Sequence, residues 1–106
     1  MSDHGVLMTA LPALEDARRI ARLLVEEKLA ACVQLLPIES TYRWEGKVQH
    51  EGEVLLLVKT RTALFNAAIA AIKAAHPYAV PEIVGWPFSV GHAPYLDWID
   101  ESTATP

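Results

Sequence analysis

The chain has 106 residues, of which 52% are hydrophobic, and a formal net charge of −4 at pH 7. This length fits a single domain over residues 1–106, with flexible ends at residues 1–4 and 102–106. Nine basic against thirteen acidic side chains argue against a nucleic-acid-binding protein, and the hydrophobic content is high for a small monomer, which favours oligomerisation.

The cysteine count and the first residues bear on the cellular compartment. A single cysteine, Cys32, excludes an intrachain disulfide and fits a reducing compartment. The sequence does not open with a basic segment followed by an apolar one, and its longest apolar run is too short to span a bilayer. We therefore expect no signal peptide, no membrane association and a cytoplasmic location.

The first third of the chain alternates strand and helix patterns. Residues 5–11 are mostly apolar and end at Pro12, which predicts a strand followed by the entrance of a helix. Apolar residues recur at spacings of three and four over residues 14–28, the pattern of an amphipathic helix. Residues 30–36 predict a second strand. Pro37 interrupts its ladder, which indicates an edge or a bulge.

A hairpin follows, and it organises the rest of the fold. Residues 41–44 predict its outgoing strand and residues 45–47 its turn, where Gly46 takes a positive φ without steric cost. The return strand, residues 47–61, begins polar and then contains residues 54–58, the unbroken apolar run VLLLV. Such a run is typical of a central strand that is buried on both faces.

The second helix is predicted between the hairpin and a His-Pro pair. Thr60 or Thr62 can cap it, and it should end near Ala75 because Pro77 disfavours helical geometry at the preceding residue. Residues 59–61 could hold an anion at its N-terminus.

The last strand and helix complete the order of secondary-structure elements along the chain. Residues 81–90 predict a fourth strand and residues 94–100 a short closing helix. The order β-α-β-β-α-β is that of the ferredoxin-like α+β sandwich, an antiparallel sheet with both main helices on one face. Residues 54–58 then need cover on the other face too, and the chain has only the closing helix to supply it. We therefore expect other subunits to cover that face.

Two residues are the main candidates for ligand chemistry. Cys32 lies in an apolar strand, where a small buried hydrophobe with an inert thiol is the simplest interpretation and a nucleophile the alternative. His76 lies at a helix end beside Tyr78, which suits either a reachable ligand or a histidine favoured by the helix macrodipole. The four histidines lack the spacing of a structural zinc site. No phosphate loop, paired carboxylates or Ser/His/Asp pattern is present, so we predict a protein that is not an enzyme.

Aromatic side chains recur through the chain. They could form a stacking surface for a ligand, or serve as core and interface residues with hydrogen-bonded polar tips. The residues concerned are Tyr42, Trp44, Tyr78, Trp86, Tyr95 and Trp98.

Five blocks in order resemble the CutA family of divalent-cation tolerance proteins. They are residues 29–33 (LAACV), 42–47 (YRWEGK), 53–61 (EVLLLVKTR), 76–82 (HPYAVPE) and 95–99 (YLDWI). The resemblance implies a ferredoxin-like homotrimer, similar in architecture to the PII signalling proteins. It also implies a role in the response to metal ions, with no catalytic reaction attached.

The resemblance also suggests a copper site. Where copper ligands are assigned in the family, they are a cysteine on the first strand and two adjacent histidines before a Pro-Tyr pair. This chain has Met8 at the first position and Ala75-His76 at the second, while Cys32 matches the family's Ala-Ala-Cys block. We therefore expect weak binding of copper or another divalent cation through His76, with help from Cys32 or Met8, and no organic cofactor.

A second hypothesis comes from a different class of protein. The chain could be a regulatory or scaffolding homotrimer that binds a small ligand or a partner protein in clefts between its subunits. The residues expected at such a cleft or interface are Tyr42, Trp44, Lys59, Tyr78, Glu82 and Trp98.

Overall fold

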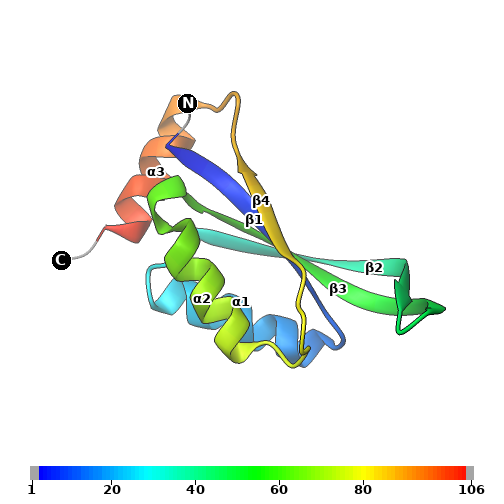
Figure 1. The fold of residues 1–106 in the computed structure, drawn as a ribbon. Helices are drawn as coiled ribbons and strands as arrows, with labels where there is room; N and C mark the ends of the chain where they lie inside the picture. Colours follow the sequence, from blue (N-terminus) through cyan, green and yellow to red (C-terminus); the bar gives the residue numbers. More distant parts are fainter. Residues whose placement is uncertain (1–2, 105–106) are drawn as a thin grey trace.

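The computed structural model describes residues 3–104 and consists of one four-stranded antiparallel sheet with three α-helices (Figure 1). The strands are β1 (His4–Leu11), β2 (Cys32–Trp44), β3 (Lys47–Arg61) and β4 (Ile83–Pro87), in the order β2-β3-β1-β4 across the sheet. The helices are α1 (Leu14–Glu26), α2 (Phe65–Ala75), preceded by the 3₁₀ turn η1 (Thr62–Leu64), and α3 (Ala93–Thr103). The predicted ferredoxin-like α+β fold is confirmed.

One face of the sheet packs against α1 and α2 and forms the core. Leu7 and Leu11 of β1 lie on this face beside Leu56 and Val58 of β3, because the register pairs Leu7 with Val58. The helices contribute fully buried side chains, among them Ile20, Leu24 and Ile72. The apolar face of α1, whose residues recur every three or four positions, thus packs on the apolar face of the strands, whose residues recur every two positions.

The opposite face of the sheet is covered only in part. Residues 54–58 lie in the central strand β3, as predicted, but only Leu56 and Val58 are fully buried. Leu55 and Leu57 point to the other face, where they are half-buried. The single chain therefore covers this face of residues 54–58 only in part, and its cover by other subunits stays a prediction.

The hairpin of β2 and β3 extends away from the rest of the molecule (Figure 1). The whole molecule measures 45 × 26 × 21 Å along its principal axes. The two-residue turn of the hairpin has φ of 50° at Glu45 and 77° at Gly46, the left-handed pair of a type I′ turn. The predicted interruption at Pro37 is wrong, because β2 is continuous from Cys32 to Trp44. A proline is compatible with this ladder because β2 is an edge strand, as the proline itself indicated.

Several predicted boundaries differ from the structure. The first helix ends at Glu26 rather than at residue 28, because Lys28 has a left-handed φ of 58°. The N-cap residue of α2 is Leu64 rather than a threonine: Thr60 belongs to β3, and Thr62 begins the 3₁₀ turn. The fourth strand covers residues 83–87 instead of 81–90, and the closing helix covers residues 93–103 instead of 94–100.

The ends of the chain are more ordered than expected. His4 begins β1, and residues 102–103 belong to α3, so the predicted flexible ends are too long. Residues 1–2 and 105–106 lie outside the described part of the chain.

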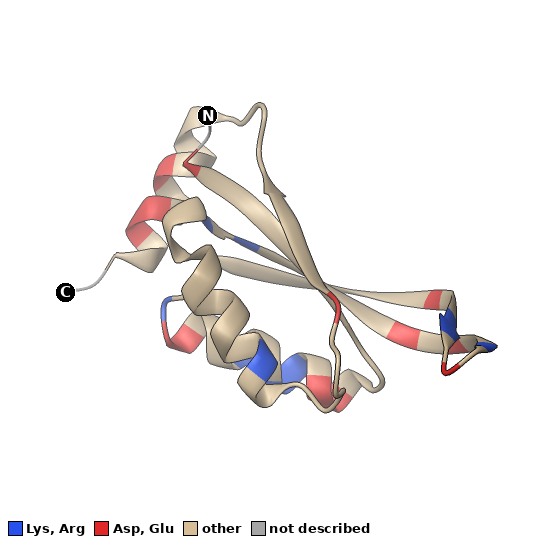
Figure 2. Cartoon of the chain, in the orientation of Figure 1, with Lys and Arg blue, Asp and Glu red and all other residues tan. Residues whose placement is uncertain are grey.

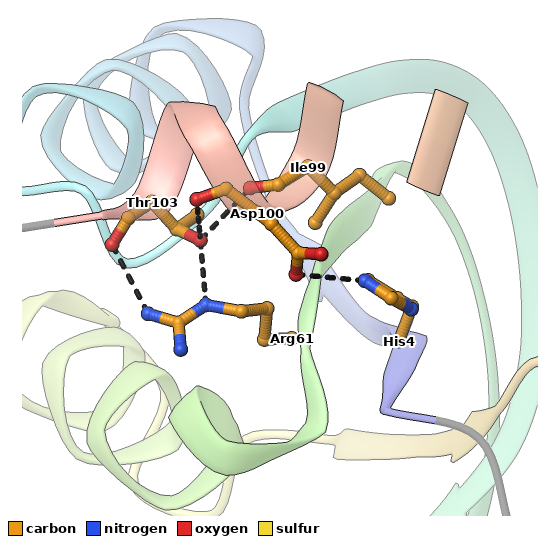
Figure 3. Close-up of polar contacts among 5 residues, drawn as sticks. All are labelled: His4, Arg61, Ile99, Asp100 and Thr103. Atoms are coloured by element: carbon orange, nitrogen blue, oxygen red, sulfur yellow. Dashed lines mark hydrogen bonds and ion pairs between the residues drawn. The ribbon is translucent and has the colours of Figure 1, made fainter. Parts of the chain in front are cut away.

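The helix α3 is attached to the ends of β1 and β3 by polar contacts (Figure 3). Its Tyr95 lies beside Lys59, which points away from the core face of Val58, so α3 lies on the sheet face opposite α1 and α2. Arg61 Nε donates a hydrogen bond to Thr103 Oγ1 (2.8 Å), and Arg61 Nη2 donates to the Thr103 carbonyl (3.1 Å). The hydroxyl of Thr103 donates in turn to the Ile99 carbonyl (2.8 Å), and Asp100 pairs with His4 (2.8 Å). The bond from Arg61 to the Thr103 carbonyl satisfies one of the carbonyls of the last helical turn that have no partner within a helix. No helix within residues 3–104 is long and apolar enough to cross a membrane.

Candidate functional site

A groove lies between the β2–β3 hairpin and the segment that follows α2. Its cavity volume is about 760 Å³, within the range of small-molecule sites. Four glutamates and three aromatic side chains line it. The lining residues are Ala10, Glu39, Ser40, Thr41, Tyr42, Trp44, Glu51, Glu53, Tyr78, Ala79, Val80 and Glu82. We call this cavity the acidic groove.

Two tyrosines hold carboxylates in the acidic groove. Tyr78 Oη donates a hydrogen bond to Glu53 Oε2 at 2.7 Å, which ties the segment after α2 to the central strand. Burial, together with the bond to Glu53 and its charge, raises the pKa of Tyr78 far above its ordinary value. Partial burial and a hydrogen bond with Glu51 also raise the pKa of Tyr42. Both hydroxyls therefore remain protonated donors at neutral pH.

The structure brings together four of the six predicted cleft residues. Tyr42, Trp44, Tyr78 and Glu82 all line the acidic groove. The other two, Lys59 of β3 and Trp98 of α3, both lie beside Tyr95 of α3. Lys59 Nζ stands 5.8 Å from the centre of the Tyr95 ring, and the Trp98 ring is 5.5 Å from that same ring.

The side chain of His76 is buried, and both of its ring nitrogens are hydrogen-bonded to the backbone. It is only 8% exposed, and its Nε2 lies 2.8 Å from the Ala10 carbonyl, while the Tyr78 N–H lies 3.2 Å from its Nδ1. A carbonyl can only accept and a backbone N–H can only donate, so the ring is neutral with its proton on Nε2. Burial lowers the pKa of His76, although the Ala10 carbonyl and the charges of Asp16 and Glu53 oppose the shift. Neither nitrogen has a lone pair free for a metal in this arrangement.

Cys32 and Met8 lie on different strands of the sheet. By register, Cys32 pairs with Lys59 and Met8 with Leu57, so both point to the sheet face opposite α1 and α2 but stand on strands separated by β3. The expectation that Cys32 is buried is wrong. It is half-exposed, with a hydrogen bond to Tyr95. Among residues 3–104, no three His, Cys, Asp or Glu side chains are grouped to hold a metal ion.

The sequence interpretation missed three of the four glutamates of the acidic groove, Glu39, Glu51 and Glu53, and the contacts of His50 on the hairpin. Thr41 Oγ1 lies 2.8 Å from His50 Nδ1, and His50 Nε2 lies 3.0 Å from Glu39 Oε1. Both contacts lie at a solvent-exposed surface. A two-residue turn at 45–46 pairs Thr41 with His50 and Ser40 with Glu51, so the register was the signal that could have identified these neighbours.

Comparison with known proteins gives one consistent result. Residues 5–102 match the family described as CutA1 divalent ion tolerance protein. The chain is 50% identical over 99 residues to the divalent-cation tolerance protein CutA of Thermus thermophilus, covering 92% of this chain and 96% of that one. The crystal structure of CutA from Xylella fastidiosa is similar with a TM-score of 0.94 at 44% identity, covering 97% of this chain and all of that one (100%).

The prediction of a cytoplasmic location is wrong. A similar structure, with a TM-score of 0.93 and 42% identity over 95% of this chain and 99% of that one, is described as the periplasmic divalent cation tolerance protein CutA from Archaeoglobus fulgidus. A rice relative is described as chloroplastic; it is 46% identical over 92% of this chain and 56% of its own length. Relatives of this chain are thus assigned to more than one compartment.

The matches agree in sequence and in structure along nearly the whole chain, and the family and the Thermus relative are named for divalent ion or cation tolerance. The chain therefore belongs to the CutA1 divalent ion tolerance protein family.

Proposed function

We propose that this chain acts in divalent-cation tolerance as a homotrimer that takes a ligand in clefts between its subunits. The observation that carries the proposal is the incompletely covered sheet face. The acidic groove is the site in each subunit where such a ligand would bind.

Large apolar side chains are exposed on the sheet face opposite α1 and α2. Val84 is 51% exposed, Trp86 49% and Leu36 44%, and by register they adjoin the half-buried side chains of Met8 and Leu57. A contiguous apolar surface of this kind is uncommon on a small monomer and typical of an interface. The helix α3 covers only the end of this face near His4 and Arg61.

The position of the acidic groove supports a cleft at a subunit boundary. Its residues come from the part of the hairpin that reaches beyond the helices, and from the segment that leads into the edge strand β4 (Figure 1). A neighbour seated on the apolar face would lie beside this groove and could close it.

Light scattering tests the assembly. We expect a mass about three times the 11.7 kDa of one chain. A mass near that of a single chain would contradict the homotrimer and with it the inter-subunit cleft.

Copper binding through His76, Cys32 and Met8 is the second candidate function. The observation in its favour is that Cys32 and Met8 present sulfur on the face where subunits would meet, and sulfur ligands favour Cu(I). His76 would first have to give up its bonds to Ala10 and Tyr78.

Titration with Cu(I) and Cu(II) tests this candidate. We expect Cys32→Ser to lose Cu(I) binding relative to the native protein. A His76→Ala variant that binds as the native protein does would remove His76 from the ligand set, and absence of binding by the native protein would reject the site altogether.

A further inference from the structure

We propose that the acidic groove binds a linear aliphatic polyamine, with ammonium groups on Glu51, Glu53 and Glu82 and methylene segments on the rings of Tyr42 and Trp44. The inference rests on the proposed function for the location of the ligand. It adds the chemical class of that ligand.

The charge of the lining selects a cation. Four glutamates and no Lys, Arg or His line the acidic groove. Glu39 is paired with His50 on the hairpin surface, whereas Glu51, Glu53 and Glu82 form no ion pair within residues 3–104. The bonds from Tyr42 and Tyr78 orient two of these carboxylates without neutralising them. A bound ligand must therefore bring positive charge.

The spacing of the carboxylates selects an extended cation. Glu51 and Glu53 are two residues apart on β3, about 7 Å along a strand, and Glu82 comes from the opposite wall of the groove. A single metal ion needs its oxygen ligands to converge, and no group of three such side chains does so among residues 3–104. Amines separated by three or four methylenes match carboxylates spread along a groove.

The aromatic lining is an independent indication. Tyr42 and Trp44 expose 37% and 47% of their surface at the acidic groove. Methylene groups pack on such rings, and ammonium groups are attracted to their faces. A hydrated inorganic cation gains little from either contact, so the combination of rings and carboxylates favours an alkylammonium chain.

Calorimetric titration with spermine and spermidine, at constant ionic strength, tests the proposal. We expect the native protein to bind spermine, Glu51→Gln to weaken binding about tenfold and Trp44→Ala about fivefold. Glu101→Gln, which removes an exposed carboxylate on α3, serves as the matched control and should bind as the native protein does. Thermal unfolding of each variant establishes that it is folded.

Three outcomes overturn the assignment. The first is that Glu101→Gln weakens spermine binding as much as Glu51→Gln does. The second is that Mg²⁺ binds the native protein as well as spermine does at the same ionic strength. The third is that spermine does not bind, because the hairpin tip of a second copy, with its Arg43 and Lys47, fills the groove. Light scattering on the same samples separates the two proposals. A single chain that binds spermine through Glu51 and Trp44 rejects the homotrimer and keeps the polyamine site, whereas a trimer that does not bind rejects the polyamine site alone.

Discussion

His76 joins the end of α2 to β1. The β1–β4 ladder ends where Thr9 pairs with Ile83, and the His76 ring donates to the next carbonyl along β1, that of Ala10. Its other nitrogen accepts from the Tyr78 N–H and so directs the segment that carries the groove tyrosine. One neutral imidazole thus satisfies two backbone groups, which explains a buried histidine without any ligand.

This arrangement predicts a pH dependence of stability. The pKa of His76 is lowered in the folded chain, so its contribution is fully present above the ordinary value of about 6.5 and is lost as pH falls below it, because the unfolded chain then binds more protons. Urea unfolding at pH 7.5 and pH 5 measures the effect. His76→Gln keeps a donor but does not titrate, so the native protein should lose more stability than this variant. Equal losses would show that His76 does not titrate as we infer.

At the scale of elements, β4 depends on close backbone contact with β1. A Cβ added at Gly85 would meet the Val6 carbonyl oxygen and Leu7, and these atoms are fixed by the ladder between the strands. We expect Gly85→Ala to destabilise the chain by about 3 kcal/mol in chemical denaturation. Gly52→Ala, in an open part of β3, is the control and should change stability by about 0.5 kcal/mol or less. Similar values for the two variants would contradict the close approach.

The attachment of α3 depends on the side chain of Thr103. Its hydroxyl accepts from Arg61 and is buried, so Thr103→Val leaves the Arg61 Nε–H without its acceptor. We expect a loss of about 1–3 kcal/mol in denaturation experiments. Thr103→Ser retains the hydroxyl and should recover most of that loss. If the serine variant is destabilised while the valine variant is as stable as the native protein, the methyl group rather than the hydrogen bond holds the helix.

The charged side chains are distributed unevenly among the helices and strands. The β2–β3 hairpin carries both signs, and α3 carries only acids (Figure 2). The acidic groove combines carboxylates of β2 and β3 with Glu82 from the segment before β4. Its negative potential therefore arises from the arrangement of elements rather than from any run of acids in the sequence.

For the whole molecule, the apolar sheet face predicts how assembly can be broken. Val84 is exposed in the single chain, so Val84→Asp should leave the subunit folded while placing a charge in the proposed interface. We expect light scattering to give the mass of one chain and circular dichroism to give a native spectrum. Val25→Asp, on α1 at the other side of the sheet, should keep the assembled mass. If both variants assemble alike, the interface lies elsewhere.

The sequence predicted the elements whose pattern is local. The turn at residues 45–47 followed from Gly46, and the central position of residues 54–58 followed from an apolar run of strand length. Boundaries were less accurate where tertiary contacts decide them. The helix α3 extends to Thr103 because Arg61, distant in sequence, binds its last turn.

The sequence by itself determined the order of the elements, the ferredoxin-like fold and an apolar surface in excess of what the chain can bury, because hydrophobic periodicity and turn residues act over short distances. The tertiary structure shows that both nitrogens of His76 are used within the chain, that β3 separates the strands of Cys32 and Met8, and that Glu51 and Glu53 share a groove with Tyr78. The physical reason is that these relations depend on strand register and on contacts between segments distant in sequence, which no local pattern specifies.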